Sequence, residues 1–140
     1  MSTASSNLGL DAFRVALRDR RAVKAIAGIA NFDADNVLAV ARAAQAAGAD
    51  ALDLAASPAL IALAKEAAPA LAVFASSVSP AALAEALEAG ADAVELGNYD
   101  ALYAEGLFLS ADDVLALAVE TRRLVGADAF LSVTVPGHLL

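Results

Sequence analysis

The sequence has 140 residues, which suits one domain, and 60% of them are hydrophobic, so material for a buried core is plentiful. The formal net charge is −8, and the densest basic cluster, residues 18–21, includes an aspartate. Nucleic acid is therefore not an expected partner, because phosphates require a clustered basic patch. The absence of cysteine excludes disulfides and thiolate chemistry. No apolar run reaches the roughly 18 residues of a membrane span and no signal peptide is evident, so we expect a cytoplasmic protein without membrane contact.

The first half of the chain predicts two helices and two strands. Residues 1–8 are small and polar, and we expect them to be disordered. Asp11 can cap an opening helix, and a strand from Ala22 to Gly28 follows it. Asp33 can cap the next helix, in which apolar residues recur at helical spacing. A short apolar strand from Ala51 to Ala55 comes next.

The second half of the chain repeats this alternation. Each predicted helix begins at a serine whose hydroxyl can cap it, and in two cases a proline occupies the first helical position. The third case, Ser110 with Asp113, resembles a capping box. The other capping serines are Ser57 and Ser79, and the predicted strands are Leu71 to Ser76, Ala93 to Gly97 and Ala129 to Val135.

A short internal repeat supports a strand–helix architecture. Residues 47–54 match residues 89–96 at an offset of 42 residues, and residues 125–131 form a looser copy. In each copy a glycine ends a helix, because glycine takes the left-handed conformation there at little cost, and a strand follows. Alternating strands and helices imply parallel strands joined by right-handed crossovers.

The polarity of the strand faces favours a barrel over an open sheet. Leu52 and Leu54 lie on one face of their strand and Asp53 on the other, and Glu95 alternates in the same way with its apolar neighbours. Central strands of an open doubly wound sheet are apolar on both faces. We therefore predict a single α/β domain of parallel βα repeats over residues 1–140, a partial TIM-type barrel with about five of the eight strands.

Four segments of the chain resemble a known family. They are residues 24–33, residues 95–100 together with Tyr103 and Gly106, residues 120–122, and residues 131–136. The family is the uncharacterised one named after a hypothetical chloroplast reading frame and shared by cyanobacteria and algal plastids. The resemblance implies an aldolase-type barrel whose members continue beyond position 140, and it implies the plastid stroma for an algal member. The family tends to place a histidine directly after proline, whereas Gly137 here precedes His138.

Asp53 and Glu95 are the sharpest candidates for chemistry. The repeat places them at equivalent positions near the carboxyl ends of the second and fourth strands, and alternate strands of a barrel share an interior layer. Their carboxylates should therefore approach each other. Such a pair could perform acid–base catalysis or hold a divalent cation. The alternative is a structural ion network in which Lys24 balances two buried acids.

Weaker candidates follow the other strands. Asp33 is explained better as a helix cap than as a site residue, and the single histidine, His138, is expected to be solvated. The loop after the fourth strand, which carries Tyr99 and Tyr103, has a functional and an ordinary loop interpretation that we leave open. The remaining polar residues could bind a ligand or satisfy backbone groups at strand ends. These candidate ligand-binding residues are Asn31, Ser76, Asn98, Ser132 and Thr134.

Two functional hypotheses follow from these patterns. In the first, the chain is the N-terminal part of a small-molecule isomerase or lyase, with Lys24, Asp53 and Glu95 as catalytic residues; the reaction class is an analogy from the fold alone. In the second, it is a non-catalytic assembly or binding protein, which self-associates or pairs with a chain carrying the missing strands because its edge strands are open. Nothing in the sequence identifies a cofactor.

Overall fold

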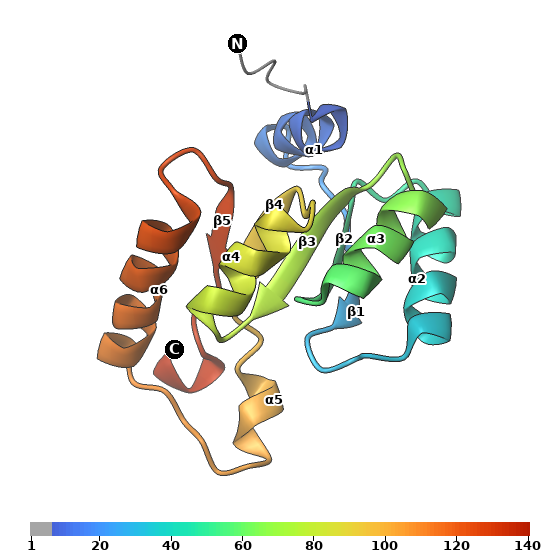
Figure 1. Ribbon diagram of the computed structural model, residues 1–140. Helices are drawn as coiled ribbons and strands as arrows, with labels where there is room; N and C mark the ends of the chain where they lie inside the picture. Colours follow the sequence, from blue (N-terminus) through green and yellow to red (C-terminus); the bar gives the residue numbers. More distant parts are fainter. Residues whose placement is uncertain (1–6) are drawn as a thin grey trace.

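The computed structural model describes residues 7–140 and contains one parallel sheet of five strands (Figure 1). The strands are β1 (Lys24–Gly28), β2 (Ala51–Ala55), β3 (Ala72–Ser77), β4 (Ala93–Leu96) and β5 (Leu131–Val133). The helices are α1 (Leu8–Arg18), α2 (Ala34–Ala46), α3 (Pro58–Ala67), α4 (Pro80–Glu88), the short α5 (Asp100–Tyr103) and α6 (Ala111–Val125), and a 3-10 turn, η1 (Gly137–Leu139), follows β5.

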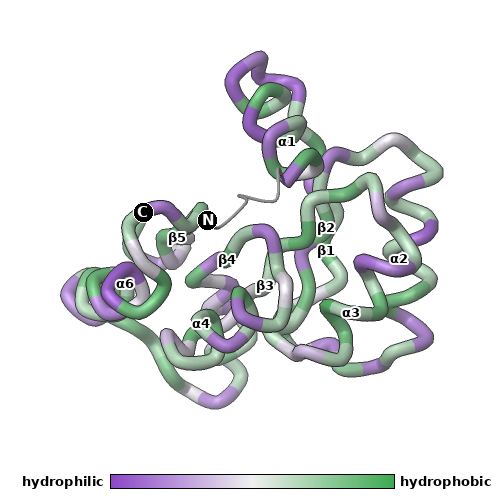
Figure 2. Tube along the Cα trace, turned by 45° about the horizontal axis from the view of Figure 1, so that its top comes forward, coloured by the Kyte–Doolittle hydropathy of each residue, from purple (hydrophilic) through white to green (hydrophobic). Residues whose placement is uncertain are grey.

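The strands lie in the sheet in their chain order, and the long crossover helices cover one face of it. The order is β1-β2-β3-β4-β5, and every neighbouring pair is parallel. Figure 2 shows α2, α3, α4 and α6 following the curve of the sheet on this side, which we call the outer face. A doubly wound sheet would place helices on both faces. The α/β fold with parallel strands is therefore confirmed, and its arrangement is that of a partial TIM-type barrel.

The main hydrophobic core lies between the outer face and these helices. Leu52 and Leu54 of β2 are fully buried there, together with Val37 of α2, Ile61 of α3 and Leu83 of α4. The outer face is thus apolar, as the alternation along β2 predicts. A helix supplies one apolar stripe and the sheet one apolar face, so this single layer of helices completes the core.

A smaller core lies on the opposite face, which we call the inner face, at the amino ends of the strands. The first residue of β2, β3 and β4 is in each case a buried alanine. These small side chains leave room for α1, whose Leu10 and Phe13 pack against them. The Phe13 ring meets the rings of Phe74 and Phe130 edge-on, with centroids 5.1 and 6.0 Å away. Helix α1 therefore covers the amino-terminal end of the inner face.

Three of the predicted helix caps are confirmed by their hydrogen bonds. The side chains of Asp33, Ser79 and Ser110 accept from backbone N–H groups in the first turns of α2, α4 and α6, and Ser110 forms the expected capping box with Asp113. Ser57 occupies the N-cap of α3, but its side chain makes no capping bond.

The predicted cap at Asp11 is wrong. Helix α1 begins at Leu8, and Asn7 is its N-cap, accepting from the Leu10 backbone N–H at 3.0 Å. Asn7 also donates to Asp92 at 2.6 Å, so a residue 85 positions away fixes where the helix starts. Asp11 lies in the first turn instead. Residues 1–8 were predicted to be disordered. Residues 1–6 lie outside the described residues, whereas Asn7 and Leu8 form the start of α1.

The aspartates of the repeat fasten neighbouring strands together. Asp50, just before β2, accepts from the Val23 backbone N–H at 2.8 Å. Asp92, just before β4, accepts in the same way from Val73 at 2.7 Å. The glycine that ends the preceding helix is left-handed in both copies, for example with φ 77° at Gly48. The repeat therefore encodes a helix end followed by a bond that fixes strand register.

The edge strands are shorter than predicted. β1 begins at Lys24, and β5 spans only Leu131–Val133, although Thr134 continues the pairing by donating to the Leu96 carbonyl at 2.9 Å. Each edge strand has a neighbour on one side only, so fewer ladder bonds extend it. Within residues 7–140, no helix is long and apolar enough to cross a membrane.

Candidate functional site

Four strands and the residue that directly follows the fifth each bring one polar side chain to a common network on the inner face. Lys24 comes from β1, Asp53 from β2, Ser76 from β3 and Glu95 from β4, while Thr134 directly follows β5. Strand alternation places them on the face opposite the main core, and Ser76 lies in register with Glu95. We call these five residues the Lys24 network.

The ammonium group of Lys24 lies between the two carboxylates. Its Nζ is 3.2 Å from Asp53 Oδ2 and donates a hydrogen bond to Glu95 Oε2. The outer members complete the chain of contacts: Ser76 donates to Asp53 Oδ1, and Thr134 donates to Glu95 Oε1 at 3.2 Å. The repeat predicted that the two carboxylates approach each other, and the structure brings them together through Lys24.

Burial is uneven within the network. Asp53 is fully buried and Glu95 is 5% exposed, whereas the Lys24 side chain is 22% exposed. The Lys24 ammonium also lies 4.9 Å from the centre of the Phe74 ring, whose face favours a cation. Among the three charged side chains of the network, Lys24 is therefore the most accessible to solvent.

The surroundings shift the proton affinities of two network members. Burial lowers the pKa of Lys24, but the hydrogen bond to Glu95 and the charges of Asp53 and Glu95 outweigh it, so the pKa is raised. Burial also raises the pKa of Asp53; the Ser76 hydrogen bond and the Lys24 charge oppose this increase only in part. Lys24 is therefore held in its cationic form, and Asp53 keeps a proton more readily than an exposed aspartate.

Gly97 makes the Thr134 contact possible. A Cβ atom at this position would overlap the Thr134 side chain, although the backbone of Gly97 is not left-handed. The missing side chain lets Thr134 approach β4 and reach Glu95. Sequence reasoning did not single out Gly97, because a glycine that ends a strand gives no sign of which neighbour it accommodates.

Tyr99 is a second residue that sequence reasoning did not place. It is only 2% exposed, and its hydroxyl donates to the Leu96 carbonyl at 3.4 Å. Burial, followed by the negative charge of Glu95, raises the pKa of the phenol. The loop therefore turns one tyrosine inward toward the site, whereas Tyr103 contacts His138.

Two other candidates hold loops together. Asn31 donates to the Ala27 carbonyl at 3.0 Å and to the Asn36 side chain at 2.7 Å, so its amide is already engaged. His138 is exposed but not free: Nδ1 lies 3.2 Å from the Tyr103 hydroxyl, and Nε2 lies 2.9 Å from the Leu109 carbonyl oxygen. It joins η1 to the segment before α6.

A pocket of about 270 Å³ opens beside the network, between α1, β1 and β5. Lys24 and Ser132 are its polar side chains, and aromatic rings including Phe74 and Phe130 line the rest. Ser132 thus faces the same space as the lysine ammonium. The arrangement offers one cation and one hydroxyl to a molecule that is otherwise held by apolar contacts.

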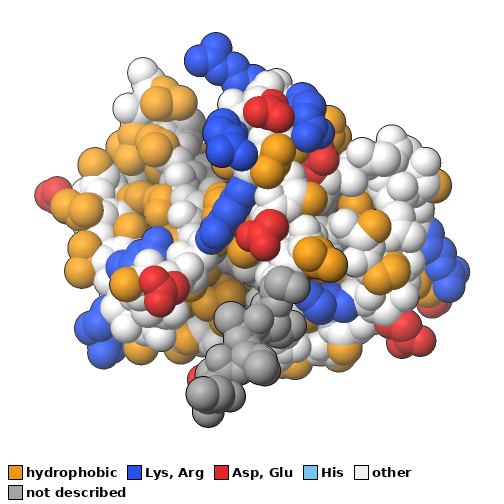
Figure 3. All heavy atoms as spheres, turned by 90° about the horizontal axis from the view of Figure 1, so that it is seen from above, with side chains coloured by type: hydrophobic (Ala, Val, Ile, Leu, Met, Phe, Trp, Pro, Cys, Tyr) orange, Lys and Arg blue, Asp and Glu red, His pale blue; other side chains and the backbone are white. Residues whose placement is uncertain are grey.

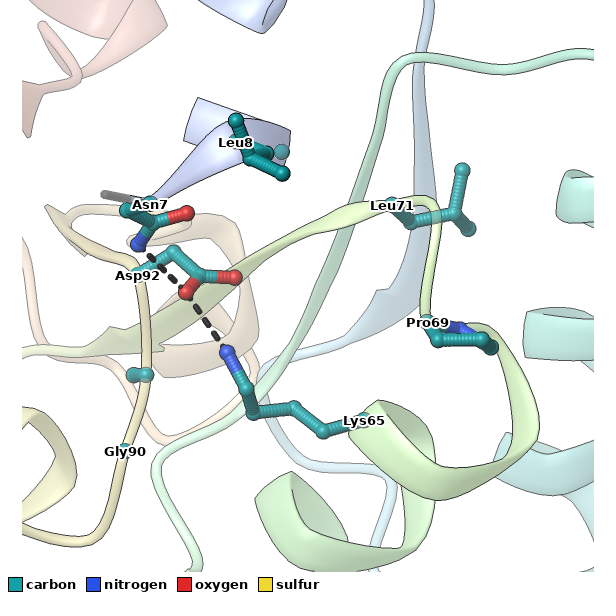
Figure 4. A pocket seen from close by; sticks show the side chains of 9 residues that line it. Asn7, Leu8, Lys65, Pro69, Leu71, Gly90 and Asp92 are labelled. Carbon is teal, nitrogen blue, oxygen red and sulfur yellow. Dashed lines mark hydrogen bonds and ion pairs between the residues drawn. The ribbon is translucent and has the colours of Figure 1, made fainter. Parts of the chain in front are cut away.

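A second pocket, about 440 Å³, lies beside the start of α1 (Figure 4). Its central carboxylate is Asp92, which accepts from Asn7 and Lys65 at 2.6 Å each and from the Val73 backbone N–H. With these bonds Asp92 joins α1, α3 and β3, and we assign it a structural role. Seen from the end of the molecule that carries α1, Lys and Arg side chains gather around this helix with acidic groups among them (Figure 3).

No group of three or more metal-ligating side chains occurs within residues 7–140. Asp53 and Glu95, the pair predicted as one possible cation site, have the Lys24 ammonium between them. In the described part of the chain, the Lys24 ammonium thus occupies the position that a metal ion bound by these two carboxylates would take.

Comparison with known proteins identifies the family. Residues 10–140 match the family described as "Protein of unknown function (DUF561)". The "Uncharacterized protein ycf23" of Cyanophora paradoxa is 37% identical over 120 residues, which are 86% of this chain and 49% of that protein. The protein of the same name from Pyropia yezoensis is 31% identical over 138 residues, 99% of this chain and 48% of that protein.

The chain spans about half the length of these curated relatives. No solved structure gives a significant match. These matches confirm the resemblance to the family named after a hypothetical chloroplast reading frame. The chain belongs to the DUF561 family.

Proposed function

We propose that this chain supplies the Lys24–Asp53–Glu95 centre of an aldolase-type barrel that transfers protons on a small carbonyl compound, as an isomerase or a lyase does. The observation that carries the proposal is the Lys24 network itself: a lysine held between two carboxylates, each of which also accepts a hydrogen bond from a hydroxyl group. Such convergence on the inner face, beside a pocket, is typical of a catalytic constellation.

Lys24 and Glu95 have complementary roles in the proposed reaction. The raised pKa keeps Lys24 positively charged, so its ammonium would stabilise a carbonyl oxygen as that oxygen gains negative charge. Glu95 would take the proton from the adjacent carbon, and the electron pair of the C–H bond would move to the carbonyl oxygen as an enolate. With an α-hydroxycarbonyl substrate, the hydroxyl proton then passes to the former carbonyl oxygen, and return of the abstracted proton to the former carbonyl carbon completes the isomerisation.

Asp53 acts as a positioning residue in this scheme. It is fully buried and bonded to Ser76, so it offers Lys24 an acceptor that does not move. Replacing it would displace the ammonium without removing a group that touches the substrate.

Proton exchange tests this proposal directly. Hydroxyacetone is incubated with the protein in D₂O, and the loss of its C–H signals is followed by ¹H NMR. The wild type should accelerate exchange, and Glu95→Gln should reduce the enzymatic rate by at least about 100-fold, as expected when a general base is lost. Glu88→Gln, on the exposed surface of α4, is the matched control. Exchange no faster than buffer, or unchanged in Glu95→Gln, would refute the proposal.

A second candidate function is assembly, and the open sheet favours it. Ile26 is in register with Asp53, so it faces inward, yet it is 58% exposed. β1 and β5 each have a free edge in the described sheet. We propose that a chain carrying further parallel βα units covers this face, because parallel edges pair with parallel strands and the curated relatives are about twice as long.

Light scattering and sedimentation test the assembly proposal. The isolated chain should self-associate or melt without cooperativity, and a chain carrying the additional units of a relative should bring it into a defined complex. A well-folded monomer with a cooperative melt that dilution does not change would contradict it.

As a compartment we propose the cytoplasm, or the plastid stroma for a plastid member, in keeping with the ycf23 name of the relatives.

A further inference from the structure

Ser132 carries a hydroxyl group that the Lys24 network does not use. The two carboxylates of the network accept from Ser76 and Thr134 instead. Ser132 is half-buried and in register with Glu95, so it lies on the inner face beside the network. It lines the pocket of about 270 Å³ that Lys24 also lines. A ligand in this pocket therefore meets both a hydroxyl group and the lysine.

The ammonium group of Lys24 retains a donor for such a ligand. An ammonium has three N–H bonds. Glu95 accepts one of them, and Asp53 Oδ2 lies 3.2 Å from the nitrogen, so one is left. Because the side chain is 22% exposed and lines the pocket, we assign the remaining N–H to an oxygen of the ligand.

Three phenyl rings form the greater part of the apolar lining. Phe13 comes from α1, Phe74 from β3 and Phe130 from the position directly before β5. The rings meet edge-on, and the centroids of Phe74 and Phe130 are 5.5 Å apart. A ligand ring can extend this edge-to-face arrangement, which adds to the gain from its buried apolar area. The pocket therefore fits an aryl group.

The charges around the pocket favour an uncharged ligand. Among the described residues that line it, Lys24 alone is ionisable, and this lysine lies between two carboxylates. A ligand carboxylate would meet a cation that is already compensated, and Glu95 would repel it. Arg14 lies 5.6 Å from the centre of the Phe130 ring, but it is exposed and does not line the pocket. A carbonyl oxygen, in contrast, needs only hydrogen-bond donors.

We propose that the substrate of the site is an uncharged aryl ketone, with its ring against the three phenylalanines and its carbonyl oxygen bonded to Lys24 and Ser132. This inference rests on the proposed function, because it names the substrate class of the same site. The ring lies toward α1 and the carbonyl group toward the carboxylates, since Lys24 is the lining residue that contacts them. This orientation directs the carbon on the other side of the carbonyl group toward Glu95, the proposed base.

Binding of matched carbonyl compounds to the ¹⁵N-labelled chain tests the inference. 2-Hydroxyacetophenone carries the ring, hydroxyacetone has a methyl group in its place, and benzoylformate is an anion of similar shape. In NMR titrations, the Kd of 2-hydroxyacetophenone should be at least about tenfold below that of hydroxyacetone, because a phenyl group buries more apolar area. The backbone amides that shift should include those of Phe130 and Ser132, and benzoylformate should bind more weakly than 2-hydroxyacetophenone.

Two variants separate the ring contact from the hydrogen bond. Phe130→Leu keeps an apolar side chain without a ring, and it should weaken 2-hydroxyacetophenone binding about threefold or more while leaving hydroxyacetone binding unchanged. Ser132→Ala should weaken the binding of both ketones about fivefold, the loss expected for one hydrogen bond. Phe32→Leu is the matched control and should change neither. Phe32 is 66% exposed and lines, with Asn98, a pocket that includes no residue of the Lys24 network.

Three results would overturn the inference: a Kd of 2-hydroxyacetophenone no lower than that of hydroxyacetone, an affinity that Phe130→Leu and Ser132→Ala both leave unchanged, or benzoylformate binding of equal or greater strength. The outcome is distinguishable from that of the proposed function. If 2-hydroxyacetophenone binds as expected but its CH₂ protons show no Glu95-dependent exchange, the catalysis alone is refuted. Glu95-dependent exchange of hydroxyacetone without any preference for the aryl ketone would refute the inference alone.

Discussion

Replacing Lys24 by methionine removes the cation that compensates two buried carboxylates. Asp53 would keep only its bond from Ser76, and Glu95 only its bond from Thr134. Loss of one partner from a buried ion pair costs about 3–5 kcal/mol. Because the Lys24 side chain is 22% exposed, we expect a loss near the lower end, about 3 kcal/mol at pH 7. At this chain length that corresponds to a fall in Tm of about 10 °C.

The loss caused by Lys24→Met should depend on pH. The pKa of Asp53 is already raised from its ordinary 3.8, and it rises further once the Lys24 charge is gone. As the pH falls through that folded-state pKa, the folded protein takes up a proton more readily than the unfolded chain, and the penalty shrinks. Urea unfolding followed by circular dichroism at pH 7 and pH 4 measures this. Arg123→Met, which breaks an exposed pair with Glu120, should change nothing measurable. An equal loss at both pH values, or a loss no larger than that of the control, would refute the reasoning.

Three further predictions concern the same network. Gly97→Ala should destabilise the protein by about 1–3 kcal/mol in urea unfolding, because the new methyl group overlaps Thr134, whereas Gly137→Ala, with no atom in reach, should not; equal behaviour of the two would contradict the packing argument. The raised pKa of Lys24 contributes stability that is complete below the ordinary lysine pKa of 10.5 and is lost as the pH rises through the higher pKa of the folded state. Above pH 10.5 the free energy of unfolding should therefore fall less steeply in Lys24→Met than in the wild type. Millimolar calcium or magnesium should not raise the Tm of the wild type beyond a matched sodium control, because the ammonium lies between the carboxylates; a clear rise would show that a cation binds there.

Local signals in the sequence predicted most of the elements correctly. Capping side chains and left-handed glycines depend on hydrogen bonds and torsions within a few residues, so the starts of α2, α4 and α6 could be identified without the fold. The alternation of apolar and polar residues along β2 correctly predicted that the face carrying Leu52 and Leu54 packs against the helices. The start of α1 was predicted wrongly for a non-local reason. Its cap, Asn7, is held partly by a hydrogen bond to Asp92, and no local sequence pattern reveals that contact.

The site could be predicted only in part. The internal repeat placed Asp53 and Glu95 at equivalent positions, and Lys24 was the expected partner of two buried acids if its strand face turned inward. Which hydroxyls complete the network could not be predicted, because this depends on strand curvature and on the close approach of Thr134 at Gly97.

The sequence by itself therefore determined the parallel strand–helix alternation, the polar inner face and the family, because these follow from periodicity, local capping and residue identity. The tertiary structure alone decided which side chains meet: that one lysine bridges the carboxylates of two strands, and that α1 covers the amino ends of the sheet. The physical reason is that contacts between residues far apart in the chain depend on register, curvature and close approach. These are collective properties of the whole sheet, and no local stretch of sequence records them.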